Sequence, residues 1–148
     1  MKAVDGGSYT KTSYLIAQQW IDFLTSNPDK YYLHIASSEG SAHTNAALRL
    51  ISKSVPLLFS RIRVINFCPA YFIAPETYSS HLQVMNFVKK EDGVINPWGT
   101  GTDQIYKNLP HVVVVHHLEG DPHNHTSHDY MVAAGPYVDK FLECGDLY

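Results

Sequence analysis

The sequence predicts an α/β protein, built as a three-layer αβα sandwich around a short, mostly parallel sheet. Two observations support this fold class. Stretches with helical spacing alternate along the chain with short apolar runs, and those runs are apolar on both faces, which is typical of strands covered on both sides. The chain has 148 residues, enough for one domain with a substantial core but too few for two. Residues 1–148 are therefore expected to form a single domain.

Three helices are expected. In residues 12–26 the apolar side chains recur at steps of three and four, and Asn27-Pro28 then ends the pattern. Residues 42–51 repeat that spacing. The last helix is expected over residues 130–144 with three side chains facing inward, although Gly135-Pro136 should break or delay it. Those three inward side chains are Val132, Phe141 and Leu142.

Four strands are expected between and after these helices. Each is a short run rich in β-branched, aromatic or other apolar residues, and each is followed by small or polar residues typical of turns. The expected strands are residues 31–35, 62–67, 82–88 and 112–115.

Composition argues against several classes of protein. The formal net charge is −3 and no basic run exceeds Lys89-Lys90, so a nucleic-acid groove is disfavoured. Neither a signal peptide nor about 18 consecutive apolar residues occurs, so no membrane span is expected. Cys68 and Cys144 have no Cys-x-x-Cys partner and fit reduced thiols. A cytoplasmic protein is expected.

A serine between a strand and a helix is the first candidate for chemistry. In residues 36–40, Ala-Ser-Ser-Glu-Gly, only Ser38 has small residues two places before and after it. A nucleophile elbow needs small flanks, because the turn is so sharp that larger side chains there would collide with neighbouring elements. The alternative interpretation is an ordinary loop with Ser38 near the helix N-cap.

An acid and a histidine follow in the order that elbow hydrolases use. Asp92 lies in an Asp-Gly turn after the third expected strand and is the preferred acid, with Glu91 and Asp103 as weaker candidates. His128 immediately precedes the last expected helix and is the preferred base, with His125 as its rival. His128 should then lie within roughly 2.6–3.2 Å of Ser38, with Asp92 near its other nitrogen.

Together, residues 36–40, the Asp92 turn and His128-Asp129-Tyr130 resemble the C-terminal half of an α/β-hydrolase-fold serine hydrolase. More narrowly, residues 32–74 resemble a family of uncharacterised chlamydial proteins whose C-terminal region is hydrolase-like. The resemblance implies hydrolysis of carboxyl esters or related acyl compounds without a cofactor. It makes Ser38 the nucleophile, Asp92 the acid and His128 the base, and the Glu39 amide one oxyanion-hole donor.

Two departures from the hydrolase pattern predict a weak enzyme. Only about 30 residues precede the first expected strand and they form one expected helix, so we expect no counterpart of the loop that supplies a second oxyanion donor. Losing one such donor typically costs ~10²–10³ in rate. Glu39 also brings a carboxylate close to the position of the oxyanion. The strands and helices that normally lie beside the first strand are expected to be missing too, which would leave an unpaired strand edge and an uncovered apolar face of the sheet. We therefore expect homo-oligomerisation or pairing with a separately encoded N-terminal half.

Two other functions compete with this interpretation. His123, His125 and His128 have a His-x-His-x-x-His spacing that resembles the metal motif of metallo-β-lactamase-fold hydrolases, with Ser127 in place of the aspartate. A zinc shell would need a further ligand from His111, His116 or His117. The second competitor is a remnant without chemistry that acts as an interaction module. The preferred interpretation includes neither a metal nor a cofactor.

Overall fold

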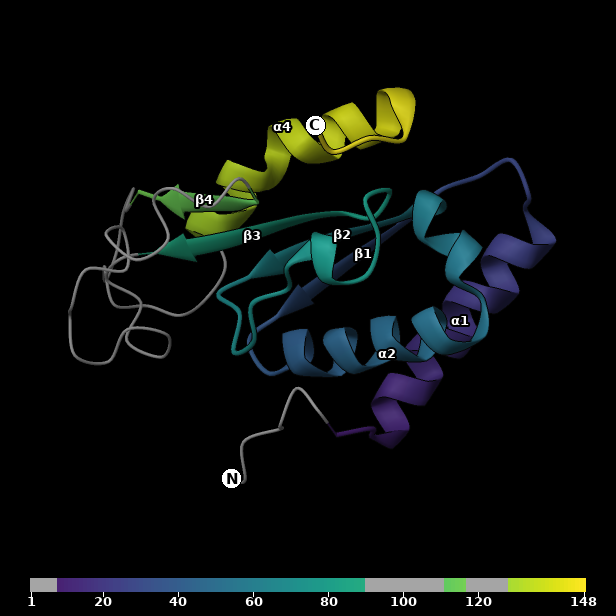
Figure 1. The fold of residues 1–148 in the computed structure, drawn as a ribbon. Helices are drawn as coiled ribbons and strands as arrows, with labels where there is room; N and C mark the ends of the chain where they lie inside the picture. The colour runs from purple at the N-terminus through teal and green to yellow at the C-terminus, as the bar shows by residue number, and fades with distance from the viewer. Residues whose placement is uncertain (1–7, 90–110, 117–127) are drawn as a thin grey trace.

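The computed structural model describes residues 8–89, 111–116 and 128–148. The described part contains three α-helices, two short 3₁₀ helices and four strands (Figure 1). In chain order these are α1 (Lys11–Ser26), β1 (Tyr32–Ser37), α2 (Gly40–Ser54), η1 (Pro56–Arg61), β2 (Ile62–Phe67), η2 (Pro75–Thr77), β3 (Gln83–Lys89), β4 (Val112–Val115) and α4 (His128–Cys144).

The strands form one sheet in the order β1-β2-β3-β4, and every adjacent pair is parallel. Helix α4 covers one face of the sheet, and α1 and α2 lie on the other (Figure 1). The predicted α/β class and the three layers are confirmed, and within the described residues the sheet is wholly rather than mostly parallel. Parallel pairing brings the carboxyl ends of all four strands to one edge, where residues from distant parts of the sequence meet.

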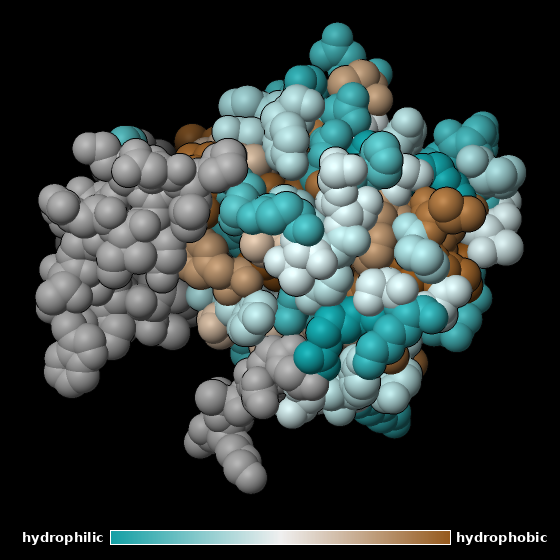
Figure 2. All heavy atoms as spheres, in the orientation of Figure 1, coloured by the Kyte–Doolittle hydropathy of each residue, from teal (hydrophilic) through white to brown (hydrophobic). Residues whose placement is uncertain are grey.

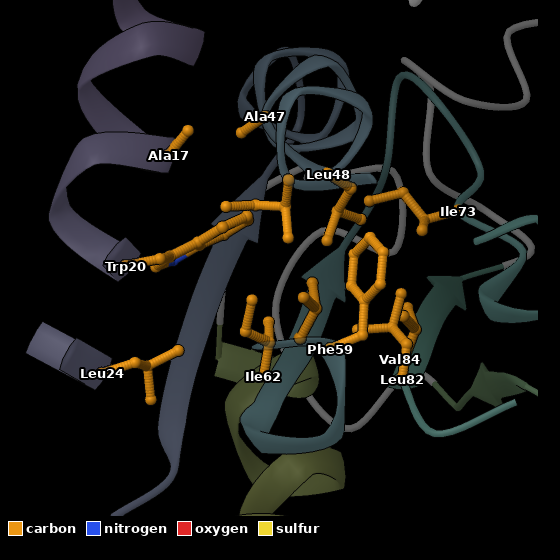
Figure 3. Packing of buried hydrophobic residues seen from close by; sticks show 12 residues of the cluster. Ala17, Trp20, Leu24, Ala47, Leu48, Phe59, Ile62, Ile73, Leu82 and Val84 are labelled. Atoms are coloured by element: carbon orange, nitrogen blue, oxygen red, sulfur yellow. The ribbon is translucent and has the colours of Figure 1, made fainter. Parts of the chain in front are cut away.

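Alternate residues of each strand supply two cores. Ile62 and Val64 point toward α1 and α2, whereas Ile65 points toward α4. Figure 3 shows the first core, in which Phe59 and the buried face of α2 meet the strands. Each large side chain that is fully buried contributes roughly 1.5–3 kcal/mol, so the two clusters are the main source of stability.

Helix α1 closes one face of the sheet, which the sequence led us to expect would be left open. A reciprocal capping box starts the helix: the Ser13 amide donates to Thr10 Oγ1 at 3.1 Å, and the Thr10 amide donates to Ser13 Oγ at 2.8 Å. Trp20 and Leu24 of α1 are fully buried against this core. The expectation of an uncovered face is therefore wrong on this side of β1. On the α4 side, Ile35 remains 50% exposed.

Two expected strand boundaries shift. The first strand runs to Ser37 rather than Ile35, because the register with β2 continues through Ala36 and Ser37. The third strand, expected over residues 82–88, is displaced by one residue to Gln83–Lys89.

The inward face of α4 differs from the expected one. Val132 and Leu142 are 51% and 75% exposed, so the prediction that they face inward is wrong, although Phe141 does pack on the core. Tyr130 and Ala134, four residues apart, define the buried face instead. The helix has apolar residues on both sides, so hydrophobicity alone does not identify the side that packs.

Helix α4 also runs without interruption through Gly135-Pro136, where a break or delay was expected. A proline normally drives the preceding residue out of the helical region because its ring clashes with that residue's Cβ. Gly135 has no Cβ, so that clash is reduced. The proline still lacks the N–H that would bond to the Val132 carbonyl four residues earlier.

Replacing the exposed Pro136 with alanine should therefore stabilise the protein, because a helical hydrogen bond is restored and no packing is lost. We expect the free energy of unfolding to rise by about 1–3 kcal/mol. Urea denaturation followed by circular dichroism measures this change. Asp139→Ala, at an exposed position of the same helix, is the control and should change stability by about 0.5 kcal/mol or less. A Pro136→Ala variant no more stable than wild type would show that the helix already compensates for the proline.

No helix in the described ranges combines the length and apolar character needed to span a bilayer.

Candidate functional site

Ser38 occupies the sharp turn between β1 and α2. Its φ angle is +51°, in the left-handed region that a residue with a side chain seldom adopts. The strand ends one residue before it and the helix begins two residues after it. The prediction of a strained turn at Ser38 is confirmed. Such a conformation costs roughly 1–3 kcal/mol and persists only where the surroundings enforce it.

The surrounding hydrogen bonds do enforce this turn. The Ser38 amide donates to the Phe67 carbonyl of the neighbouring strand at 3.0 Å. The Ser38 carbonyl accepts three bonds, from Ser41 Oγ at 2.6 Å, the Ser41 amide at 3.1 Å and the Ala70 amide at 3.0 Å. Ser41 Oγ also accepts from the Tyr71 amide at 2.8 Å. The backbone on both sides of the Ser38 side chain is thus fixed, as pre-organised chemistry requires.

The small flanks of Ser38 lie against each other. A Cβ added to Gly40 would be 3.9 Å from Ala36 Cβ, which is ordinary contact. The expected collision at Gly40 is therefore wrong, and alanine would fit there. The helix N-cap is Glu39, whose side chain makes no capping bond, so Ser38 is not the N-cap.

A second strained residue, missed from the sequence, lies beside Ser38. Cys68 follows β2 as Ser38 follows β1, and its φ angle is +40°. Its amide donates to the Phe87 carbonyl of β3 at 2.9 Å. The preceding residues, Ser37 and Phe67, are register partners, so the two turns lie side by side at the carboxyl edge. The sequence signal was faint, since Cys68-Pro69 marked only the end of a strand.

His128 is the first residue of α4, and contacts of the next two residues place this helix end at the same edge. Asp129 Oδ2 accepts from Lys89 Nζ at 3.1 Å, and Lys89 is the last residue of β3. The Tyr130 ring lies 5.9 Å from that of Phe67, whose carbonyl bonds to the Ser38 amide. The structure thus brings the start of α4 to the edge that carries Ser38. Hydrogen bonding between His128 and Ser38 stays a prediction.

The Lys89–Asp129 pair was also missed from the sequence. Both side chains are almost completely buried, at 1% and 5% exposure. Lys89 Nζ also lies 5.8 Å from the centre of the Tyr130 ring. Removing one partner of such a pair typically costs about 3–5 kcal/mol, because the other charge is left unpaired. The pair therefore anchors the start of α4 to the end of β3.

Two of the remaining candidate residues, His111 and His116, lie in the described part of the chain, and the others lie outside it. His111 lies before β4, 3.8 Å from Glu76, beside a cavity of about 420 Å³ that Leu82 and Tyr148 also line. His116 follows β4 and is exposed. The four residues of β4 lie between these histidines, and five steps of strand separate them by roughly 16 Å, so one metal shell cannot include both. Asp92, Glu91, Asp103, His117, His123 and His125 lie outside the described residues.

Below the turn, His34 of β1 packs against α2. Thr44 Oγ1 donates to the Gly40 carbonyl at 2.8 Å, so its hydroxyl proton is already used. His34 Nε2 lies 3.0 Å from Thr44 Oγ1 and therefore serves as the donor. Burial lowers the pKa of His34 from 6.5 to about 4. The imidazole is thus neutral in the folded protein at pH 7.

This pKa predicts a loss of stability in acid. The unfolded chain binds a proton at His34 as the pH falls through 6.5, whereas the folded chain does so only near pH 4. The contribution of neutral His34 to the free energy of unfolding is therefore fully present above pH 6.5. As the pH falls from 6.5 to about 4, the free energy of unfolding declines by up to about 3 kcal/mol. Urea denaturation at pH 7, 5.5 and 4 measures the decline. His34→Gln keeps an N–H donor but does not titrate, so its decline should be smaller; an unchanged decline would contradict the assignment.

Within the described ranges, no three or more His, Cys, Asp or Glu side chains gather closely enough to hold a metal. Comparisons with protein-family models, curated protein sequences and solved structures find no match to this chain.

The chemistry open to the site follows from its geometry. The partly exposed Ser38 hydroxyl lies on a fixed, strained turn at the amino end of α2, where the helix dipole favours negative charge.

Proposed function

We propose that the chain is a serine-hydrolase-like protein that cleaves carboxyl esters or related acyl compounds. The observation that carries the proposal is the left-handed Ser38, held between a parallel strand and a buried helix by bonds on both sides. The strain points to function because an ordinary loop serine gains nothing from a conformation that costs free energy. The likeness to the C-terminal half of an α/β-hydrolase fold remains part of this proposal.

In the proposed reaction, Ser38 Oγ attacks the acyl carbon while His128 accepts the hydroxyl proton. The Glu39 amide stabilises the oxyanion, and Asp92 orients the imidazole and stabilises its charged form. The alcohol leaves with the proton from His128. Water, activated by the same histidine, then releases the acid and restores Ser38. The chemistry requires no cofactor and no metal.

Two features of the described structure support this assignment. The first strand, the turn and the buried helix α2 stand in the order that a nucleophile elbow requires. The start of α4 lies at the same sheet edge as Ser38, two strands away, through the Lys89–Asp129 pair. Cys68 and Cys144 are not joined in a disulfide, which fits the proposed cytoplasmic location.

Labelling with a fluorophosphonate probe tests the proposal, because the probe reacts with activated serines and does not require the natural substrate. We expect the wild-type chain to be labelled slowly and Ser38→Ala not to be labelled. His128→Ala should slow labelling by about 10² or more, the usual contribution of a general base. Ser37→Ala, the exposed neighbouring serine, is the matched control and should label like wild type.

Two outcomes would contradict the proposal. One is labelling that survives in Ser38→Ala, which would assign the reactivity to another residue. The other is an unlabelled wild-type chain that binds zinc stoichiometrically, which would favour the cluster of His123, His125 and His128. Chelators should not change labelling of the wild-type protein.

A further inference from the structure

Strand β1 lies at the edge of the sheet, and in the described part of the chain it pairs only with β2. The Ser38 amide bonds to β2, and backbone groups alternate in direction along a strand. The even-numbered residues of β1 therefore point their N–H and C=O groups at β2. Those of Leu33, Ile35 and Ser37 point away from the sheet.

Strand β1 lacks the charged residues and prolines that protect the edge strands of many monomeric proteins. Residues 31–38 contain no lysine, arginine, aspartate, glutamate or proline. Apolar side chains are exposed beside it on both faces: Ile35 is 50% exposed on the α4 side, and Phe23 of α1, which packs on Tyr32, is 36% exposed. An unprotected strand with apolar neighbours on both sides is suited to receive another strand.

We propose that the occupant is a second copy of this chain, paired antiparallel through β1 about a two-fold axis at Ile35. The two four-stranded sheets then join into one sheet, with both α4 helices on one face. This association does not depend on the chemistry proposed for Ser38.

In only one antiparallel register do the outward N–H and C=O groups of Leu33, Ile35 and Ser37 all bond to the partner strand. Ile35 lies opposite the partner's Ile35, and Leu33 lies opposite the partner's Ser37. Each outward-facing residue contributes one N–H and one C=O, so every outward backbone group of β1 finds a partner. The half-exposed Ile35 side chains cover each other at the centre of the interface.

Charge complementarity favours the same register. Lys30 lies two residues before β1 and Glu39 two residues after it, so antiparallel pairing brings Lys30 and the partner's Glu39 to the same end of the interface, at both of its ends. No like charges oppose each other along the strand, which is uncharged. A self-complementary pattern of this kind is what a two-fold interface requires.

Light scattering coupled to gel filtration, over a concentration series, tests the pairing. We expect a dimer for wild type. Ile35→Lys places two ammonium groups together at the axis, and Ile35→Pro removes an outward N–H without affecting the bonds to β2. Each should raise the dissociation constant by about tenfold or more. Leu57→Lys changes an 89% exposed apolar residue on η1 and is the matched control, which should remain dimeric.

Two further measurements exclude misfolding as the cause. Lys30→Glu and Glu39→Lys should each weaken the dimer by repulsion, and the double variant should restore it. Amide hydrogen exchange should show Leu33, Ile35 and Ser37 protected in the dimer and exchanging rapidly in folded Ile35→Lys. A wild-type chain that is monomeric at 100 µM, or a dimer that Ile35→Lys and Ile35→Pro leave intact, would overturn the proposal.

Discussion

Replacing Asn86 with alanine is expected to lower the free energy of unfolding by about 3–5 kcal/mol. Asn86 is fully buried in β3, and its Nδ2 donates to the carbonyls of Ile73 at 2.9 Å and His111 at 3.2 Å. Its Oδ1 accepts from Asn66 Nδ2 at 3.0 Å. Alanine would remove all three of these bonds, although the His111 carbonyl would still accept from the amide of residue 86 at 2.8 Å, and it would also leave a cavity beneath the segment that contains Ile73.

Asn66→Ala is the matched control, because Asn66 is also fully buried and is the register partner of Asn86. Its Oδ1 has no hydrogen-bond partner in the described structure, and its Nδ2 bonds only to Asn86 Oδ1 among the bonds described. We expect this substitution to cost about 2 kcal/mol less than Asn86→Ala. Urea denaturation of both variants measures the difference. Equal losses would show that cavity formation, rather than the hydrogen bonds, determines the cost.

Gly145→Ala should be the second large loss, about 2–4 kcal/mol. Gly145 has a φ of +81°, and an added Cβ would lie 2.7 Å from Cδ2 of the Tyr31 ring. Moving the half-exposed ring aside would disturb its contact with the Arg63 guanidinium, which lies 5.0 Å from the ring centre. Arg63 Nε also donates to the Gly145 carbonyl at 2.9 Å, so displacing Gly145 would strain that bond as well.

Gly40→Ala is the control for this prediction. An added Cβ there meets only Ala36 Cβ, at 3.9 Å, so stability should be unchanged or rise by up to about 1 kcal/mol. Thermal unfolding compares the two. In a Tyr31→Ala background, Gly145→Ala should cost less, because the clash is gone and only the backbone strain remains. If Gly145→Ala lowers stability equally with and without the Tyr31 side chain, the strained φ angle alone accounts for the loss.

The strands and the turn were predictable because their signals are local. The unbroken apolar run of residues 112–115 identified β4, a run rich in β-branched residues identified β2, and two small residues around Ser38 identified a sharp turn. The packing face of α4 was not predictable, since its exposed side includes Val132 and Leu142. Apolar side chains on both sides of a helix give no preferred direction until the sheet supplies one.

The candidate site was only partly predictable, because its other members act through long-range contacts. Cys68 lies beside Ser38 because β1 and β2 are paired, which the sequence around Cys68 does not reveal. Lys89 and Asp129 are 40 residues apart in sequence, and neither residue type signals a buried ion pair. Spacing in the sequence can suggest an order of nucleophile, acid and base, but it cannot identify the charges that fix a helix end.

The contacts of Arg63 have a consequence for the order in which the chain folds. Its guanidinium is buried, and it bonds to Gly145 and Asp146, more than 80 residues later in the chain. During synthesis, β2 emerges before either acceptor exists, so Arg63 cannot make these two bonds until residues 145 and 146 have been made, although the Ile62 and His81 carbonyls that it also contacts are available earlier. The packing around Arg63 at the amino end of the sheet is therefore completed only after the segment that follows α4 has docked, which makes this end of the sheet dependent on contacts of high sequence separation.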